Sequence, residues 1–248
     1  MRRRISASDN KYSRGIVAVA AGSTKYPGAS ILAVGGARRG NAGYVKYLSG
    51  NVKLRDLVVA QFPDVVPIRS LAREHCDAFV IGPGSPPLHS IPKSIPVVLD
   101  GSAISVLRMP SIRRGISLPI VTPHEGELRY LGVEIETHLK DSKRLEIAAD
   151  LSKKFGAIIV LKGNRTIICG PDGRSHIDEM GGPELATAGS GDVLAGLIGS
   201  MVVATKAGID PFTLVCDAVQ LHSRAGRYAA QEFTSVTAVE LLDALAHV

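Results

Sequence analysis

Short runs of continuously apolar residues recur along this chain, and they limit the folds that it can adopt more than any other feature. They are rich in Val and Ile and occur at Gly15–Ala21, Leu57–Ala60, Ala78–Ile81, Pro96–Leu99, Pro119–Val121 and Ala157–Leu161. A strand with one face in water alternates polar and apolar residues, whereas a strand covered on both faces is apolar throughout. We therefore expect an α/β fold in which a central, mostly parallel sheet is flanked by helices on both faces.

The spacing of apolar residues between and after these runs predicts helices. The clearest pattern covers Asp141–Phe155, where apolar residues recur on one face, Asp141 can cap the start and Gly156 can end the helix. Further helices are expected at Pro27–Arg39, Glu125–Leu131, Gly189–Ala204, Pro211–Gln231 and Ala238–Ala246. These helices lie between or after the strand candidates, as the layered α/β fold requires.

The pattern changes after Leu161. Arg165–Cys169 and Ser175–Ile177 are separated by a turn at Asp172-Gly173, which is typical of a β-hairpin. No internal repeat, low-complexity tract or long linker divides the chain. We expect a single domain spanning residues 1–248.

The net charge of +6 is concentrated at the start of the chain. Residues 1–14 carry +4, so the remainder carries only +2, and we expect 1–14, with the triplet Arg2–Arg4, to be a flexible, solvated segment. The chain has no Trp and few aromatic side chains on which bases could stack, so no nucleic-acid partner is expected. Residues 1–20 do not resemble a signal peptide, and the apolar run within them is about half a membrane span, so no membrane partner is expected.

The cysteines and histidines predict neither disulfides nor a metal centre. Cys76, Cys169 and Cys216 are odd in number, far apart and free of any CxxC pair, which is typical of buried thiols in a cytoplasmic protein. No set of His, Cys and Asp has the spacing of a zinc site, so we expect no protein metal ligands.

The glycine motifs exclude two common phosphate-binding turns and favour a third arrangement. No GxGxxG follows a strand and the chain lacks a Gly-Lys dipeptide, so neither a Rossmann turn nor a P-loop is present. Gly189-Ser190-Gly191-Asp192 instead opens an apolar helix, where amide groups can converge on an anion. Asp192 is either an acidic residue stabilised by the helix dipole or a base that accepts a proton from an attacking hydroxyl; its place among glycines favours the base.

Other polar residues follow the predicted strands, where ligands bind in parallel α/β sheets. His124 follows one strand. It is either a turn histidine hydrogen-bonded to backbone or a ligand contact, and its place at the strand end favours the ligand contact. Glu125 and Glu127 beside it suit the ligand site and the first turn of a helix equally. Asp100 follows another strand and can alternatively be a helix cap. Two more strand ends carry Gly82-Pro83-Gly84, which allows close backbone approach or a plain turn, and Lys162-Gly163-Asn164-Arg165-Thr166, whose lysine can neutralise phosphate or point to solvent.

Taken together, these residues resemble the ribokinase-like superfamily and, within it, the ADP/ATP-dependent NAD(P)H-hydrate dehydratases. The matching motifs, in the family's order over roughly residues 11–246, are Gly22-Ser23, Tyr26-Pro27-Gly28-Ala29, Gly82-Pro83-Gly84, Leu99-Asp100, Thr122-Pro123-His124-Glu125-Gly126-Glu127, Leu161-Lys162-Gly163 and Leu185-Ala186-Thr187-Ala188-Gly189-Ser190-Gly191-Asp192-Val193-Leu194-Ala195-Gly196. Three positions depart from the family pattern: Glu125 stands where Pro is usual, Pro86 where a glycine is usual, and Pro183 where Asn is common.

The resemblance implies a ribokinase-like fold and an enzyme, a hydro-lyase that repairs NADHX or NADPHX, the hydrates of NADH and NADPH, at the expense of ADP or ATP. We expect phosphorylation of the hydrate hydroxyl followed by elimination of phosphate, with Mg²⁺ bridging the nucleotide phosphates. The residues assigned in this way are Asp192 as the base; the amides of Gly189, Ser190 and Gly191 as the anion hole; Lys162, Gly163, Asn164, Arg165, Thr166 and Gly191 for ADP or ATP; and Ala29, Gly84, His124 and Asp192 for the hydrated dinucleotide.

The resemblance also implies a homo-oligomer, such as a tetramer, and a separate epimerase that supplies the other hydrate epimer. Two alternatives use the same residues. A small-molecule kinase acting on a thiamin-precursor type of alcohol would leave a stable phosphoester, and a non-catalytic nucleotide-sensing module would bind without turnover.

Overall fold

The computed structural model describes residues 5–86, 91–135 and 139–248. Within these ranges the strands form one nine-stranded sheet, in the order β3-β2-β1-β4-β5-β6-β7-β8-β9. The strands are β1 (Ile16–Ala20), β2 (Tyr44–Leu48), β3 (Val66–Ile68), β4 (Ala78–Ile81), β5 (Pro96–Leu99), β6 (Leu118–Val121), β7 (Ile158–Leu161), β8 (Thr166–Cys169) and β9 (Ser175–Asp178). All pairings from β3 across to β7 are parallel, and only β7–β8 and β8–β9 are antiparallel, which confirms the mostly parallel sheet and the hairpin.

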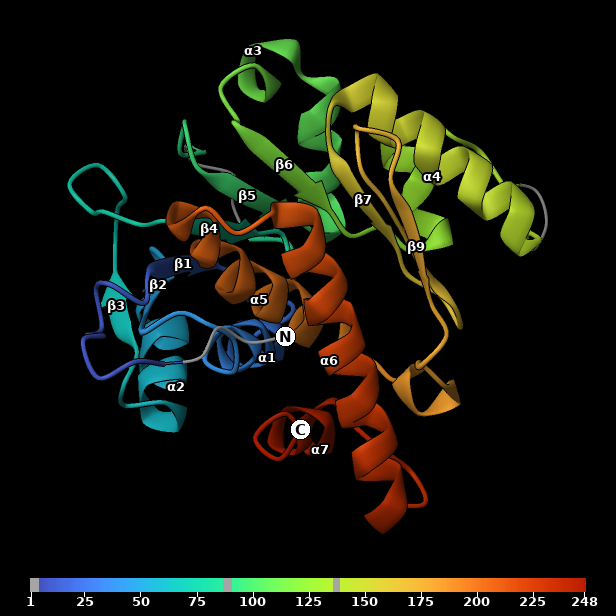
Figure 1. Ribbon diagram of the computed structural model, residues 1–248. Helices are drawn as coiled ribbons and strands as arrows, with labels where there is room; N and C mark the ends of the chain where they lie inside the picture. The colour runs from blue at the N-terminus through green and yellow to red at the C-terminus, as the bar shows by residue number, and fades with distance from the viewer. Residues whose placement is uncertain (1–4, 87–90, 136–138) are drawn as a thin grey trace.

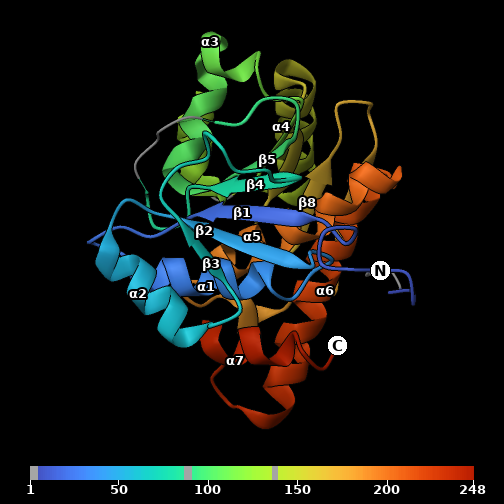
Figure 2. The same cartoon turned by 90° about the vertical axis from the view of Figure 1, so that its left-hand side faces the viewer.

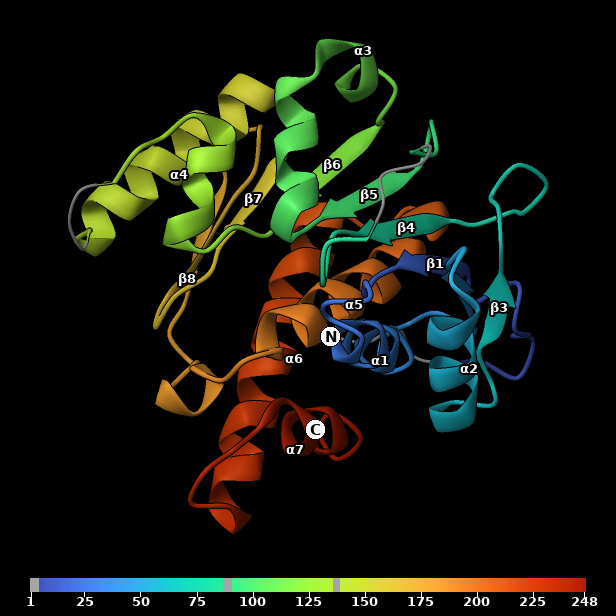
Figure 3. The same cartoon turned by 180° about the vertical axis from the view of Figure 1, so that it is seen from behind.

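Helices cover both faces of this sheet (Figures 1 and 2). The α-helices are α1 (Gly28–Ala37), α2 (Val52–Gln61), α3 (Pro110–Arg113), α4 (Asp141–Phe155), α5 (Ser190–Val202), α6 (Pro211–Glu232) and α7 (Ala238–Ala244), and the 3-10 helices are η1 (Gly101–Arg108), η2 (Glu125–Leu131), η3 (Pro183–Leu185) and η4 (Val203–Ala207). In Figure 2 the sheet separates α3 and α4 above from α2 and α7 below. Seen from behind, α4 lies against β7 and β8 (Figure 3).

The two helix layers enclose two apolar cores, and this explains why the strands are apolar throughout. In β1, Val17 and Val19 belong to the core shared with α1, α5, α6 and α7, whereas Ile16 and Ala18 belong to the core shared with η1, η2 and α4. Successive side chains of a strand point to opposite faces, so both faces must be apolar when both are covered.

Close packing of α1 against α5 fixes the position of the helix that begins with the glycine motif. A Cβ at Gly196 would lie 1.9 Å from the carbonyl oxygen of Ala33, and one at Gly36 would lie 2.1 Å from that of Val193. Because the two backbones touch, neither helix can shift without the other. Gly196, part of the motif that the family resemblance rests on, therefore has a packing role.

One strand prediction is wrong. Leu57–Ala60 was expected to be a strand, but it lies within α2, where Leu57 is exposed and Val58 is buried. Asn51 caps this helix by accepting a hydrogen bond from the Lys53 amide at 3.0 Å. The helical spacing of Leu54 and Val58 on the buried face outweighs the short apolar run.

The strand β2, which pairs with β1 on the side away from β4, was not predicted from the sequence because a lysine interrupts it. Lys46 is 6% exposed, and its Nζ donates to Glu74 Oε2 at 2.6 Å and to the His75 carbonyl at 3.0 Å. These partners offset the desolvation of a charged group inside the sheet. A polar residue in a strand is therefore compatible with burial when acceptors lie at its tip.

The helix α4 begins and ends at the predicted residues, and Gly156 follows it in the left-handed region with φ +61°. The predicted capping role of Asp141 is wrong, because Lys140 occupies the capping position and Asp141 lies in the first turn. Its carboxylate instead pairs with Arg144 at 3.0 Å.

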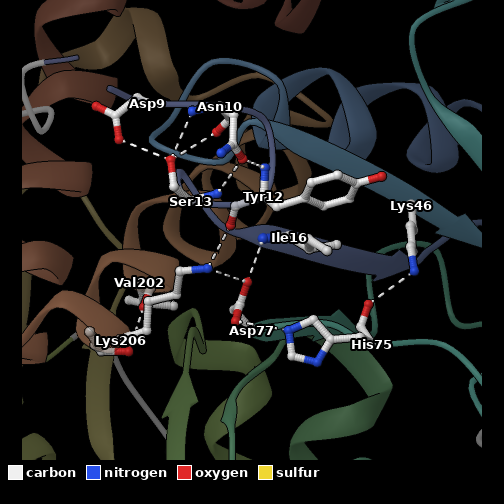
Figure 4. A network of polar contacts seen from close by, with 11 residues as sticks. Asp9, Asn10, Tyr12, Ser13, Ile16, Lys46, His75, Asp77, Val202 and Lys206 are labelled. Carbon is white, nitrogen blue, oxygen red and sulfur yellow. Dashed lines mark hydrogen bonds and ion pairs between the residues drawn. The ribbon is translucent and has the colours of Figure 1, made fainter. Parts of the chain in front are cut away.

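The start of the chain contacts the end of the sheet opposite to the strands' carboxyl ends. Lys206 Nζ donates to the Tyr12 carbonyl at 2.8 Å and lies 3.1 Å from Asp77 Oδ2, which also accepts from the Ile16 amide at 2.7 Å (Figure 4). The triplet Arg2–Arg4 lies outside the described residues. The flexibility expected of residues 1–14 stays a prediction.

The cysteines are free thiols: Cys76 and Cys169 are buried and Cys216 is partly buried. Burial raises the pKa of the Cys76 thiol to about 11, so it remains protonated at neutral pH. In the described part of the chain, no helix combines the length and apolar character needed to cross a membrane.

Candidate active site

The carboxyl ends of the parallel strands bring the predicted motifs together. Asp100 follows β5, His124 follows β6 and Lys162 follows β7. The last two are joined, because the Lys162 amide donates to the Pro123 carbonyl at 2.7 Å and His124 and Lys162 form a parallel bridge. The start of α5 faces the same point, since a Cβ at Gly191 would lie 3.2 Å from Lys162 Nζ.

Lys162 is the cationic centre of this site. Its Nζ donates to Asp100 Oδ1 at 2.7 Å and lies 3.6 Å from Glu127 Oε2. Burial alone would lower the pKa of Lys162, but the attraction of Asp100, followed by that of Glu127, outweighs burial and raises it. The lysine therefore points into the protein as a charged ammonium rather than out to solvent.

Asp100 occupies the residue before η1, yet its side chain makes no capping hydrogen bond. Its Oδ1 instead accepts from Lys162 and from Thr122 Oγ1, the latter at 2.6 Å, and the residue is only 4% exposed. Of its two sequence interpretations, the structure favours the site carboxylate over the helix cap.

Glu127 both caps the 3-10 helix η2 and faces the cationic centre of the site. Its Oε2 accepts from the His124 amide at 2.9 Å, which caps η2, and the same carboxylate faces Lys162. Glu125, the neighbouring acid, turns away from this cluster and lies 3.1 Å from Arg144 Nε. The two glutamates therefore serve different cations.

The start of α5 presents open amides. Gly189 precedes the helix with φ +92°, a conformation that favours glycine, and Ser190 uses its hydroxyl and amide to contact the Thr187 carbonyl at 3.0 and 3.3 Å. In the described part of the chain no acceptor is bonded to the amides of Gly191 or Asp192. Two N–H groups at the positive end of the helix are thus available to an anion.

Asp192 lies at this helix start in a partly buried position. Desolvation, followed by repulsion from Asp100, raises the pKa of its carboxyl to about 7, while Lys162 opposes that rise. A carboxylate that is half ionised near neutral pH is suited to take a proton and later release it. The raised pKa is therefore consistent with the predicted base.

A cavity of about 720 Å³ joins these residues. Those of the predicted residues that line it are Lys162, Gly163, Asn164, Thr166, Gly189, Ser190, Gly191, Asp192 and His124. Arg165 does not line it: its side chain is about half exposed and forms ion pairs with Glu179 at 2.8 Å and Asp141 at 3.5 Å. The loop around Arg165 therefore faces the cavity without the arginine's charge.

Ala29, in the first turn of α1, and Gly84, in the loop after β4, are in contact near the carboxyl ends of β1 and β4. A Cβ at Gly84, whose φ is +66°, would lie 2.5 Å from the Ala29 Cβ and 3.0 Å from Gly22 Cα. A second cavity of about 430 Å³ borders this contact and is lined by Gly22, Ser49 and other residues of the β1 and β2 ends. The predicted dinucleotide residues thus lie in two groups, with His124 and Asp192 at the larger cavity.

Two polar residues of the larger cavity were missed by the sequence interpretation. His222 and Ser223 of α6 line the larger cavity, and His222 Nε2 lies 2.9 Å from the Ser190 carbonyl. Burial lowers the pKa of His222 to about 4, so the ring is neutral at physiological pH. Ser223 Oγ donates to the buried Asp178 at 2.6 Å. The available signal was a pair of polar residues on the apolar face of a long helix.

Comparison with known proteins identifies the same family that the sequence motifs resemble. The family model for NAD(P)H-hydrate dehydratase matches residues 17–247. The chain is 33% identical over 206 residues to the bifunctional NAD(P)H-hydrate repair enzyme Nnr of Mycobacterium tuberculosis, covering 78% of this chain and 42% of that protein. It spans about half the length of the bifunctional relatives that it matches.

A relative of similar length gives nearly complete coverage. The ADP-dependent (S)-NAD(P)H-hydrate dehydratase of Bacillus subtilis is 32% identical over 261 residues, which cover 98% of this chain and 91% of that protein. The crystal structure of the Bacillus subtilis ADP/ATP-dependent NAD(P)H-hydrate dehydratase co-crystallised with ATP and Mg²⁺ superposes with a TM-score of 0.83 at 29% identity, over 100% of this chain and 92% of that one. The fold is ribokinase-like, and the chain belongs to the NAD(P)H-hydrate dehydratase family.

Proposed function

We propose that this protein restores NADH and NADPH from their hydrates, (S)-NADHX and (S)-NADPHX, at the expense of ADP or ATP. The observation that carries the proposal is the position of Asp192: a carboxyl with a pKa of about 7 beside open helix amides, in a cavity of about 720 Å³ that also contains the Lys162 ammonium. A base next to an anion-binding helix start is the arrangement that phosphoryl transfer to a hydroxyl requires.

The chemistry follows from the poor leaving ability of hydroxide. In the hydrate, the nicotinamide ring carries a hydroxyl at C6, and Asp192 takes the proton of this hydroxyl. The hydroxyl oxygen then bonds to the terminal phosphorus of ADP or ATP, while the bond from that phosphorus to the leaving nucleotide oxygen breaks. The C6–O bond then breaks, and its electrons leave with inorganic phosphate as the ring nitrogen's lone pair forms a double bond to C6. The departing phosphate takes the C5 proton, which restores the dihydronicotinamide ring, and Asp192 releases its own proton to water.

The anion hole and the lysine stabilise the charge that this transfer moves. The open amides of Gly191 and Asp192 point from the helix start, and Lys162 Nζ lies next to Gly191. Donors fixed in place before the reaction act on the phosphoryl oxygens with little reorganisation. The sequence predicted the amides of Gly189, Ser190 and Gly191 for this hole. Because the Ser190 amide already donates to the Thr187 carbonyl at 3.3 Å, we assign the hole to the amides of Gly189, Gly191 and Asp192.

The substrates divide between two groups of residues. We assign ADP or ATP to the loop Lys162 to Thr166, with Arg165 contributing backbone only because its side chain pairs with Glu179 outside the cavity. The hydrated dinucleotide would contact Ala29, Gly84 and His124, with its hydroxyl at Asp192.

The residues present fit a phosphate-bound Mg²⁺. Within the described ranges, no three His, Cys, Asp or Glu side chains are grouped to hold a metal ion by themselves, and Mg²⁺ commonly keeps several waters and binds phosphate oxygens. Asp100, Glu127 and Asp192 outnumber the single ammonium of Lys162, so a polyphosphate needs a cation here. Asp100 and Glu127 would hold the ion through water, and it would neutralise phosphate charge.

The wider setting is also a proposal. We expect a homo-oligomer, such as a tetramer, and a separate epimerase that interconverts the hydrates. The three free thiols favour a reducing compartment, the cytoplasm.

The decisive experiment combines the purified chain with chemically prepared NADHX or NADPHX, ADP or ATP, and Mg²⁺. Restored absorbance of the reduced nicotinamide together with release of inorganic phosphate is expected. Formation of a stable phosphoester without restored absorbance would identify a kinase, and nucleotide binding without turnover would identify a sensing module; either result contradicts the proposal.

A further inference from the structure

Arg144 is a buried charge that the proposed chemistry does not use. It lies in the first turn of α4, is only 4% exposed, and does not line either cavity. Burying a guanidinium is unfavourable unless its charge and donors are matched by partners. Its partners therefore indicate what the burial achieves.

Most of these partners belong to the loop between β7 and β8, residues 162–165, called here the nucleotide loop, or adjoin it. Arg144 Nη1 donates to the Arg165 carbonyl at 2.8 Å, and Nη2 donates to the carbonyls of Lys162 at 3.3 Å and Leu161 at 3.4 Å. These carbonyls therefore point toward α4. Carbonyl oxygens carry partial negative charge, and turning them away from the cavity removes repulsion toward a polyphosphate.

The backbone of the nucleotide loop also rests directly on the guanidinium. A Cβ at Gly163 would lie 2.2 Å from Arg144 Nη2 and 2.9 Å from Cζ. While the arginine is in place, the loop cannot move closer to α4, and the hydrogen bonds from Arg144 to the loop carbonyls keep it from moving away. One side chain therefore sets the distance between the loop and the helix.

The same arginine contacts the second loop of the site. Its Nε lies 3.1 Å from Glu125 Oε1, an ion pair without hydrogen-bond geometry, and its Nη1 donates to Asp141. Glu125 belongs to the segment His124 to Glu127, called here the glutamate turn. Arg144 therefore connects the nucleotide loop to the turn that carries His124, and it does so through the residue at which this chain departs from the family's proline.

We infer that Arg144 is a positioning residue for the nucleotide site: it holds the nucleotide loop with its carbonyls away from the phosphates, and Glu125 fixes the arginine relative to the glutamate turn. The inference rests on the proposed function only in taking ADP or ATP as the ligand of that loop. Arg144 itself touches no substrate.

The test measures binding of ADP and of ATP, each with Mg²⁺, by titration calorimetry without any hydrate present. Arg144→Met should weaken ADP binding at least tenfold, because the loop carbonyls lose three hydrogen bonds. Arg144→Lys should lie between Met and the wild type, since an ammonium keeps the charge but cannot reach all the acceptors. The matched control is Lys143→Met, which removes an exposed cation of the same helix and should change the affinity less than twofold.

A second variant covers the case in which Arg144→Met does not fold. Glu125→Gln keeps the shape of the side chain and removes its charge, and it should weaken ADP binding about two- to fivefold while the thermal unfolding temperature stays near that of the wild type. In steady-state assays, folded variants should raise the KM for ADP while kcat at saturating ADP stays within about threefold. A purely structural role would lower the folded fraction and leave the KM unchanged.

Affinities for ADP equal to the wild type's in folded Arg144→Met, or in Glu125→Gln where the former does not fold, would overturn the inference. If the wild type binds ADP but does not restore NADH, the proposed dehydration fails while the binding data still decide the role of Arg144. If the wild type binds neither ADP nor ATP, both proposals fail.

Discussion

The two halves of the site are built by different means. Around β1 and β4, Gly22, Ala29 and Gly84 are in near contact, so that position is defined by shape and backbone proximity. Around β5 to β7 and the start of α5, Asp100, Lys162 and neighbouring carboxylates form a cluster defined by charge.

The difference separates two tasks. A shape-defined surface can discriminate a ligand by fit but has little effect on proton affinity, whereas a desolvated charge cluster shifts pKa values and can take part in the chemistry. Changes in the charged half should therefore act on kcat and on pH dependence, and changes in the glycine half should act on KM.

The largest effect is expected for Asp192→Asn. The amide cannot accept the hydroxyl proton, so kcat should fall by about 10²- to 10⁴-fold, while ADP binds within a few-fold of the wild-type affinity. The measurement is restoration of NADH absorbance together with calorimetric binding of ADP. Turnover near the wild-type rate would remove Asp192 from the chemistry and with it the assigned role of the charged half.

Lys162→Met should have the next largest effect, a fall in kcat/KM of roughly 10²-fold, because a fixed donor to the transferred phosphoryl group is lost. The carboxylates around it then lose their cation, so the pKa of Asp192 should rise further. Because the base must be ionised, wild-type activity should increase as the pH rises through about 7, and the variant's midpoint should lie higher. An unshifted pH profile would contradict the proposed coupling between Lys162 and Asp192.

Gly84→Ala tests the glycine half. Its Cβ would lie 2.5 Å from that of Ala29, so the contact must open, and the KM for the hydrate should rise about tenfold, or about 1.4 kcal/mol, with kcat nearly unchanged. Gly173→Ala is the matched control, because Gly173 has a similar positive φ of +89° but nothing within 4 Å of the added carbon. Both variants should lose stability through backbone strain, and only Gly84→Ala should change the KM.

The smallest effect concerns stability. The pKa of Asp192 is raised from 3.8 to about 7 on folding, so between these values the folded state binds more protons than the unfolded state. The protonated Asp192 carboxyl therefore stabilises the folded state fully below about pH 4, and this stabilisation is lost as the pH rises through about 7. Asp192→Asn should therefore gain stability relative to the wild type as the pH rises from about 5 to about 7, by on the order of 1 kcal/mol for each pH unit, measured by urea unfolding. A difference that does not vary with pH would contradict the raised pKa.

The sequence predicted most elements of the fold where local pattern and tertiary environment agree. Asp141–Phe155 was predicted to its end residues because its apolar stripe and its terminal glycine are both local signals. Leu57–Ala60 was wrong because four apolar residues suit a strand or a helix equally, and the Asn51 cap outside that window decides. Tyr44–Leu48 was missed because the acceptors that allow Lys46 to be buried come from residues 74 and 75.

The candidate site shows the same division between local and distant information. The residues Asp100, His124, Lys162 and Asp192 were each singled out from their motifs, yet Asp100 and Lys162 are 62 positions apart and nothing local pairs them. His222 and Arg144 were not recognised. The polar pair His222 and Ser223 on an apolar helix face was the only local signal for the histidine, and the acceptors that hold Arg144 lie on other segments of the chain.

By itself, the sequence determined the layered α/β architecture and predicted an anion-binding helix start at Gly189-Ser190-Gly191, because both follow from the period of apolar residues and from glycines close together in the chain. Only the tertiary structure decided that burial raises the pKa of the Asp192 carboxyl to about 7, that Lys162 is paired with Asp100, and that Arg144 donates to a carbonyl of the nucleotide loop. The physical reason is that pKa values and loop positions depend on desolvation and on partners brought together by the fold, whereas periodicity and backbone freedom depend on neighbours in the chain.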